Sequence, residues 1–199
     1  MVTWLHGLGS TRSTVLSSRS VVRGLFLLAS LIILPAPAAA QSVPKEYQLR
    51  AVMLWRFAQF TEWPASAFES PESPLIIGVL GENPFGDAVR VAVKGETAHG
   101  RRIEVKYFRR FQNAVTGCHV LYISHSESGR LTDILAAIDR KPILTVSDIE
   151  GFAREGRGIV RFLPEQSRVA IRINVEAARA AHLVLDSRLL RLAEVVPSQ

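Results

Sequence analysis

The sequence predicts a single three-layer α/β domain, with a mostly parallel sheet of about six strands, helices on both faces and a late antiparallel hairpin. Three observations predict this fold class. Short apolar runs alternate with segments of helical periodicity, which is typical of strand–helix–strand units. Two apolar runs near the end of the chain are separated only by a turn, which predicts the hairpin. The chain has 199 residues, 48% of them apolar, and this is enough for one core of its own.

The first 40 residues differ in kind from the rest. Three arginines and no acidic residue accompany an apolar run of 11 residues, GLFLLASLIIL, and the sequence PAPAAA then ends at Ala40. This pattern predicts a secretory signal peptide over 1–40, cleaved after Ala40, and therefore a periplasmic domain over 41–199. An uncleaved membrane anchor is the alternative, although a span needs about 20 apolar residues.

The first helix is expected between Gln41 and Trp63, because Pro44 suits a first helical turn and the residue before Pro64 avoids helical geometry. Its apolar residues form two faces at helical spacing. One face contains Tyr47, Ala51, Leu54, Trp55 and Ala58, and the other contains Leu49, Met53, Phe57 and Phe60. Such a helix is either buried in the core or shared with a partner, and both interpretations remain open.

The remaining elements follow in order. Apolar runs predict strands at 75–80, 119–124 and 142–147, and a more alternating segment predicts one at 102–108. Helices are expected at 87–93, at 148–154, and after residue 124, where Leu131, Ile134, Leu135 and Ile138 have helical spacing. The hairpin strands are expected at 156–163 and 168–174, with a turn at 164–167, and closing helices at 176–181 and 187–195.

Two S-x-x-E patterns lie where a strand gives way to a helical pattern, one beginning at Ser124 and the other at Ser147. Each matches a capping box at a helix N-terminus. In a parallel sheet both helix starts would lie beyond the carboxyl ends of the strands, where such folds bind ligands. This predicts an anion or carboxylate crevice formed by Gly81, Asn83, Ser124, Ser147 and Asp148. Alternatively, the serines only cap their helices.

The net charge and the lack of catalytic or metal-binding motifs argue against several classes of function. The chain has a net charge of +6, but without the leader it keeps 21 basic and 18 acidic residues, which is no signature of nucleic-acid binding. There is no G-x-S-x-G motif, and His99, His119, His125 and His182 lack metal-ligand spacing. We therefore expect no enzyme activity, no cofactor, no metal and no nucleic-acid partner.

The single cysteine, Cys118, excludes an intramolecular disulfide. It lies at the start of an apolar strand, where a small buried hydrophobic residue is the simplest interpretation. The alternative is an exposed thiol that pairs between chains in an oxidising compartment.

Several blocks of sequence together resemble the YfiR family of periplasmic regulators, over about residues 45 to 196. The blocks are EYQLRAVMLWRFAQFTEWP (46–64), PLIIGVLGENPFGDAV (74–89), GCHVLYIS with the following helix (117–140), PILTVSDIEGFAREG (142–156), RVAIRINVEAARAA (168–181) and LDSRLLRLAEVV (185–196). The resemblance implies an α/β domain without catalysis. It also implies repression of an inner-membrane diguanylate cyclase through its periplasmic region, relieved by an outer-membrane lipoprotein. Family members that respond to redox state have several cysteines, whereas this chain has only Cys118.

These observations support a periplasmic regulator that binds the sensor region of an inner-membrane signalling protein, a diguanylate cyclase or a sensor kinase. Its contact surface would be the first helix or the segment with Gly151, Phe152 and Arg154, and a homodimer is possible. The alternative is a periplasmic protein that binds a small ligand, an amino acid or nucleotide-like molecule, in the predicted crevice. The sequence TVSDIEGFAREG also resembles a ligand-holding segment of two-lobed periplasmic substrate-binding proteins. An unrecognised hydrolase is a third interpretation.

Overall fold

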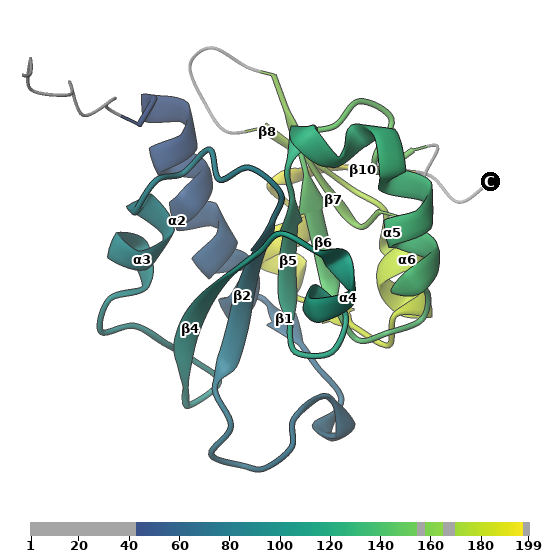
Figure 1. Ribbon diagram of the computed structural model, residues 1–199. Helices are drawn as coiled ribbons and strands as arrows, with labels where there is room; N and C mark the ends of the chain where they lie inside the picture. Colours follow the sequence, from purple (N-terminus) through teal and green to yellow (C-terminus); the bar gives the residue numbers. More distant parts are fainter. Residues whose placement is uncertain (1–42, 155–157, 165–169, 197–199) are drawn as a thin grey trace, which may run out of the picture. The chain divides into compact units, whose positions relative to one another are not determined.

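A computed structural model describes residues 43–154, 158–164 and 170–196, which belong to one compact unit (Figure 1). The predicted signal peptide and its cleavage site lie outside the described residues. So do most of the predicted hairpin turn and the first residues of its second strand. Within the described part, no helix is long and apolar enough to cross a membrane.

The described part contains a mostly parallel sheet of eight strands, in the order β10-β8-β7-β6-β5-β2-β4-β3. The hairpin prediction is confirmed, because β7 and β8 pair antiparallel. The expected number of about six strands is wrong, since short strands add to the sheet at both edges. The strands are β2 (Leu75–Leu80), β3 (Thr97–Ala98), β4 (Arg101–Phe108), β5 (Val120–Ile123), β6 (Leu144–Ser147), β7 (Val160–Leu163), β8 (Ala170–Ile173) and β10 (Ala193–Val195), with β1 (Thr61–Glu62) and β9 (Val184–Leu185) in a separate pair.

The helices are α2 (Lys45–Gln59), α3 (Ala88–Val93), α4 (Phe111–Ala114), α5 (Leu131–Ala137), α6 (Val175–Ala180) and α7 (Ser187–Leu190), with 3₁₀ helices η1 (Ala65–Ala67) and η2 (His125–Arg130). The helix predicted over 148–154 is wrong, because the structure forms turns there. Gly151 has a φ of 74°, a left-handed conformation that interrupts a right-handed helix.

The helix predicted over 187–195 is correct only in its first turn. It ends at Leu190, and the chain then extends as β10 along β8, where the amide of Val196 donates to the carbonyl of Ile173 at 2.9 Å. The free edge of β8 offers unpaired backbone groups, and pairing with them outweighs the local helical preference.

Strand β2 lies near the centre of the sheet, between β4 and β5, and all six of its residues are buried. Gly78 lies in the middle of this strand. A side chain there would overlap the sulfur of Cys118 and would come within 2.9 Å of the Phe108 ring. The close packing of the sheet against this face therefore requires glycine.

Alternate strand residues enter two separate hydrophobic clusters. Ile77 and Val79 belong to the larger cluster, which α2 completes with Ala51, Leu54, Phe57 and Ala58. Ile76 and Leu80 belong to the second cluster, with Ile134 and Leu135 of α5. Figure 1 shows α3 beside α2, and α5 beside α6. The mixed α/β architecture is thus confirmed, and the three-layer arrangement stays a prediction.

Candidate functional site

The carboxyl ends of three parallel strands lie side by side. Leu80 of β2 is in register with Ile123 of β5, which in turn is in register with Ser147 of β6. This geometry brings Gly81, Ser124 and Ser147 to one edge of the sheet, as expected from the alternating pattern. Their role in ligand binding stays a prediction, and the contacts of each side chain bear on it.

The two serines do not form capping boxes. The Ser147 hydroxyl donates to the carbonyl of Ile123 at 2.8 Å and accepts from the amide of Ile149 at 3.1 Å. Ser124 makes no side-chain cap; its backbone carbonyl accepts from the amide of Glu127 at 2.9 Å, as in a 3₁₀ turn. Both serines are buried. The capping predictions are therefore wrong, because tight turns rather than α-helical turns follow both strands.

Asp148 is the centre of a buried ionic cluster beneath the first turn of α2. Its Oδ2 accepts from Arg50 at 2.7 Å and from the Tyr47 hydroxyl at 3.0 Å. Arg50 also pairs with Glu46, and its guanidinium lies over the rings of Tyr47 and Phe162, at 4.9 and 5.2 Å from the centroids. A buried arginine needs such partners because its charge cannot be neutralised. Asp148 therefore anchors α2 to the carboxyl edge of the sheet.

Aromatic rings lie next to this cluster. Tyr122 of β5 is fully buried and meets the Phe85 ring edge to face, with centroids 4.7 Å apart. Burial, with the nearby Asp148 carboxylate as a second cause, raises the pKa of the Tyr122 hydroxyl above its usual range. Burial and Asp148 likewise raise the pKa of Tyr47. Both phenols therefore stay protonated at neutral pH, and the Tyr47 hydroxyl donates its hydrogen bond to Asp148.

Gly81 and Asn83 line a hollow of about 630 Å³, together with Tyr107, Arg109 and Ser126. Its polar groups are largely used within the protein. Asn83 accepts from the amide of Phe85 at 3.0 Å, and Ser126 accepts from the amide of Glu82 at 3.0 Å. The hollow contains only two of the five residues predicted for the crevice, since Ser124, Ser147 and Asp148 are absent from its lining.

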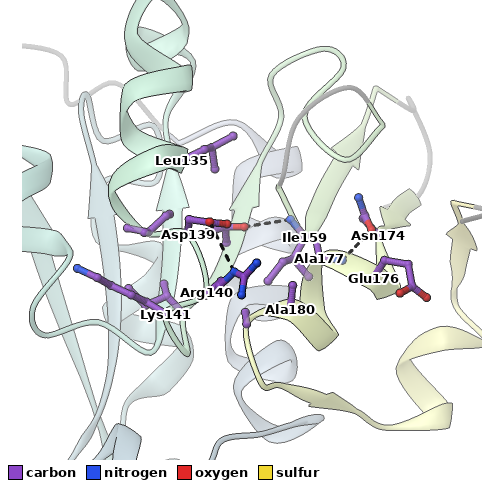
Figure 2. Close-up of a pocket in the computed structure, with 13 residues that line it drawn as sticks. Leu135, Asp139, Arg140, Lys141, Ile159, Asn174, Glu176, Ala177 and Ala180 are labelled. Carbon is purple, nitrogen blue, oxygen red and sulfur yellow. Dashed lines mark hydrogen bonds and ion pairs between the residues drawn. The ribbon is translucent and has the colours of Figure 1, made fainter. Parts of the chain in front are cut away.

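A second hollow, of about 320 Å³, lies between the end of α5 and α6 (Figure 2). Its walls include Leu135, Ile138 and Ala177, and Arg140 and Lys141 lie at its α5 side. Arg140 has a φ of 57°, which is uncommon for a residue with a side chain. Sequence reasoning did not find this hollow. The charged residues 139–141, directly before Pro142, were the only sequence feature that could have indicated it. They resemble an ordinary helix end.

The two predicted faces of the first helix differ in solvent exposure. Leu54 and Ala58 of the first face are fully buried. On the second face, Phe57 is buried while Leu49 keeps 43% of its surface exposed, and the adjacent Val52 keeps 41%. Leu49, Val52 and Met53 have the spacing of one helix face, and we call them the exposed face of α2. The core interpretation thus fits the buried residues of this helix, and the partner interpretation stays a prediction.

Only part of the segment predicted as a second contact surface is accessible. Phe152 is fully buried, and its ring is packed so closely that a side chain on Gly158 would overlap it. The Phe152 ring therefore offers no surface to a partner in this conformation. Arg154 is exposed and pairs with Glu194 at 3.1 Å, so it is the accessible member of the three predicted residues.

Cys118 is a free, buried cysteine. Burial raises the pKa of its thiol to about 12, with a small opposing effect from Lys106. The interpretation as a buried hydrophobic residue is confirmed, and an exposed thiol is not what the structure has. In the described ranges, no group of three or more His, Cys, Asp or Glu residues is arranged to hold a metal ion.

Comparison with known proteins places the fold in a family. A search of curated proteins found no match. The YfiR/HmsC-like family model matches residues 47–194, which includes every helix and nearly every strand residue described above. The matched range contains most of the anchored first helix, the central strands and the late hairpin. The chain therefore belongs to the YfiR/HmsC-like family.

Proposed function

We propose that this protein is a non-enzymatic periplasmic regulator of cyclic di-GMP signalling. In this proposal it binds the sensor region of an inner-membrane signalling protein, a diguanylate cyclase or a sensor kinase, and an outer-membrane lipoprotein is a second partner. Membership of the YfiR/HmsC-like family is the observation that carries the proposal. The secretory pattern of residues 1–40 supports the periplasmic location.

The exposed face of α2 is the contact surface that we propose. Leu49 and Val52 are among the large apolar side chains that remain exposed, although α2 is firmly held by its buried face. A rigid helix with apolar residues three and four positions apart suits a groove on a partner, because little conformational entropy is lost on binding. Arg56 lies one turn further along α2 and rests over the Trp55 ring at 4.4 Å. It adds a polar rim of the kind found around interface cores.

Complementation of a gene deletion tests this proposal. Deletion is expected to change cellular cyclic di-GMP, and the wild-type gene should restore the original level. Val52→Asp places a charge on the exposed face of α2 without touching the core, so it should fail to restore the level and should lose the crosslink to a membrane partner. Val184→Asp is the matched control, because Val184 on β9 is 61% exposed and lies outside α2.

The outcomes separate the possibilities. If deletion leaves cyclic di-GMP unchanged and no partner is crosslinked, the proposed function is wrong. If Val52→Asp restores the level as well as wild type does, the exposed face of α2 is not the contact surface. The small-ligand interpretation has less support, because the hydroxyl of Ser147 is used by backbone groups and Asp148 is held by Arg50.

A further inference from the structure

One row of residues across the sheet carries an unusual set of charges. In this row, Arg161 of β7 is the register partner of Arg172 of β8, which in turn is the partner of Glu194 of β10. Figure 1 shows β7, β8 and β10 together on the side of the sheet away from β4. Register partners have their side chains on the same face, about 4.5–5.5 Å apart at Cβ. The two arginines are therefore direct neighbours.

Among the described residues, one carboxylate pairs with arginines of this row. Glu194 accepts from Arg172 at 2.7 Å through one oxygen and from Arg154 at 3.1 Å through the other. Arg161 has no ion pair with any residue in the described ranges, although its Nε is buried. The Nε of Arg172 is also buried without an acceptor, and the Arg172 side chain is only 13% exposed. Among the described residues, Arg154 and Arg172 thus share one carboxylate, and the neighbouring Arg161 has none.

This arrangement is unfavourable for the isolated chain. Like charges directly opposite each other on a sheet destabilise it, and buried N–H groups without acceptors add to the cost. Arginine cannot lose its proton to relieve this repulsion, as lysine or histidine would. An added carboxylate beside these guanidinium groups would offset the excess positive charge.

We propose that Arg154, Arg161 and Arg172 form a binding site for the carboxylates of an acidic segment in a partner protein. Glu194 already shows how the site recognises its ligand, because its two oxygens each accept from a different guanidinium. A carboxylate from outside would bind to Arg161 in the same way, beside Glu194. The existence of a protein partner rests on the proposed function, whereas the affinity for carboxylates rests on this row alone.

Binding of a labelled hexaglutamate peptide to the purified protein, followed by fluorescence anisotropy, tests the site. Arg161→Gln removes the arginine that has no ion pair among the described residues, and it should weaken binding about tenfold, since an added charged hydrogen bond is lost. Arg110→Gln is the matched control, because Arg110 is exposed, has no described ion pair and lies outside the row. It should leave the affinity unchanged.

Thermal unfolding distinguishes a binding role from a structural one. Without peptide, Arg161→Gln should keep or raise the melting temperature, because it relieves repulsion from Arg172. A clear fall in melting temperature, or equal peptide affinity in wild type and Arg161→Gln, would overturn the proposal. Binding to phosphatidylglycerol vesicles that depends on Arg161, without peptide binding, would also overturn it and indicate a lipid headgroup instead.

The proposed function and this site fail in different ways. If the gene deletion leaves cyclic di-GMP unchanged but the peptide binds through Arg161, the site stands and the signalling role does not. If Val52→Asp abolishes regulation while Arg161→Gln alters neither peptide binding nor regulation, the signalling role stands and this site does not.

Discussion

The role that the sequence pattern predicts for Asp148 differs from the contacts that Asp148 makes in the structure. The sequence pattern assigns it to a ligand crevice, whereas the structure places its carboxylate against Arg50 and Tyr47. Asp148→Ala would leave the Arg50 charge buried with only Glu46 as partner. Loss of one member of a buried ion pair costs about 3–5 kcal/mol. We expect a loss near the lower end of this range, because Arg50 would still pair with Glu46, whose side chain is 46% exposed.

A loss of about 3 kcal/mol corresponds to a fall in melting temperature of roughly 6–12 °C for a domain of this size. Urea unfolding of the ligand-free protein, followed by circular dichroism, measures the free energy directly. Asp87→Ala is the matched control, since the Asp87–Arg90 pair is 3.5 Å long and both side chains are exposed. It should cost at most about 1 kcal/mol.

A double variant distinguishes the loss of the ion pair from a nonspecific loss of stability caused by the substitution. Arg50→Met with Asp148→Ala removes both charges, and it should recover much of the stability lost in Asp148→Ala, because no uncompensated charge remains. If Asp148→Ala changes the free energy of unfolding by less than about 1 kcal/mol, the anchoring role of Asp148 is refuted and the ligand interpretation gains support.

Two further predictions concern titratable groups. Burial lowers the pKa of His119, whose Nδ1 accepts from the amide of Ile76 at 3.0 Å and whose Nε2 lies 3.1 Å from the carbonyl of Ala67. Its stabilising effect is therefore full above the unfolded value of 6.5 and decreases as pH falls through 6.5 towards the folded pKa. Unfolding free energies measured across this range should fall less steeply in His119→Phe than in wild type, and equal slopes would contradict this. Because the pKa of the Cys118 thiol is about 12, iodoacetamide at about pH 8 should label it only after unfolding. Rapid labelling of the folded protein, or a disulfide-linked dimer on a non-reducing gel, would contradict the buried position.

Much of the central architecture could be predicted from local patterns. The run LIIGVL has no polar residue, and a strand with both faces buried and neighbours on both sides requires such a run. The hairpin was predictable for a similar reason, because Val169, Ile171 and Ile173 alternate with polar or small residues. The spacing of apolar residues indicates which side chains are buried, and this burial follows directly from the position of a strand in the sheet.

The edges of the sheet and the turns were less predictable. Residues 193–195 have a helical pattern, yet they form β10 because β8 has a free edge there. Two S-x-x-E patterns suggested capping boxes, but the chain turns too tightly after each strand for the serine side chain to cap a helix. Both outcomes depend on backbone partners that are distant in the sequence.

What the sequence by itself determined is the order of the central strands and the late hairpin, the family and the solitary state of Cys118 within the chain. Only the tertiary structure decided what the charged residues do. Asp148 meets Arg50 from 98 positions away, and Arg161 lies opposite Arg172 only because of the hairpin register. The physical reason is that apolar periodicity is a local property of the chain, whereas the partner of a charge is set by which strands and helices pack together.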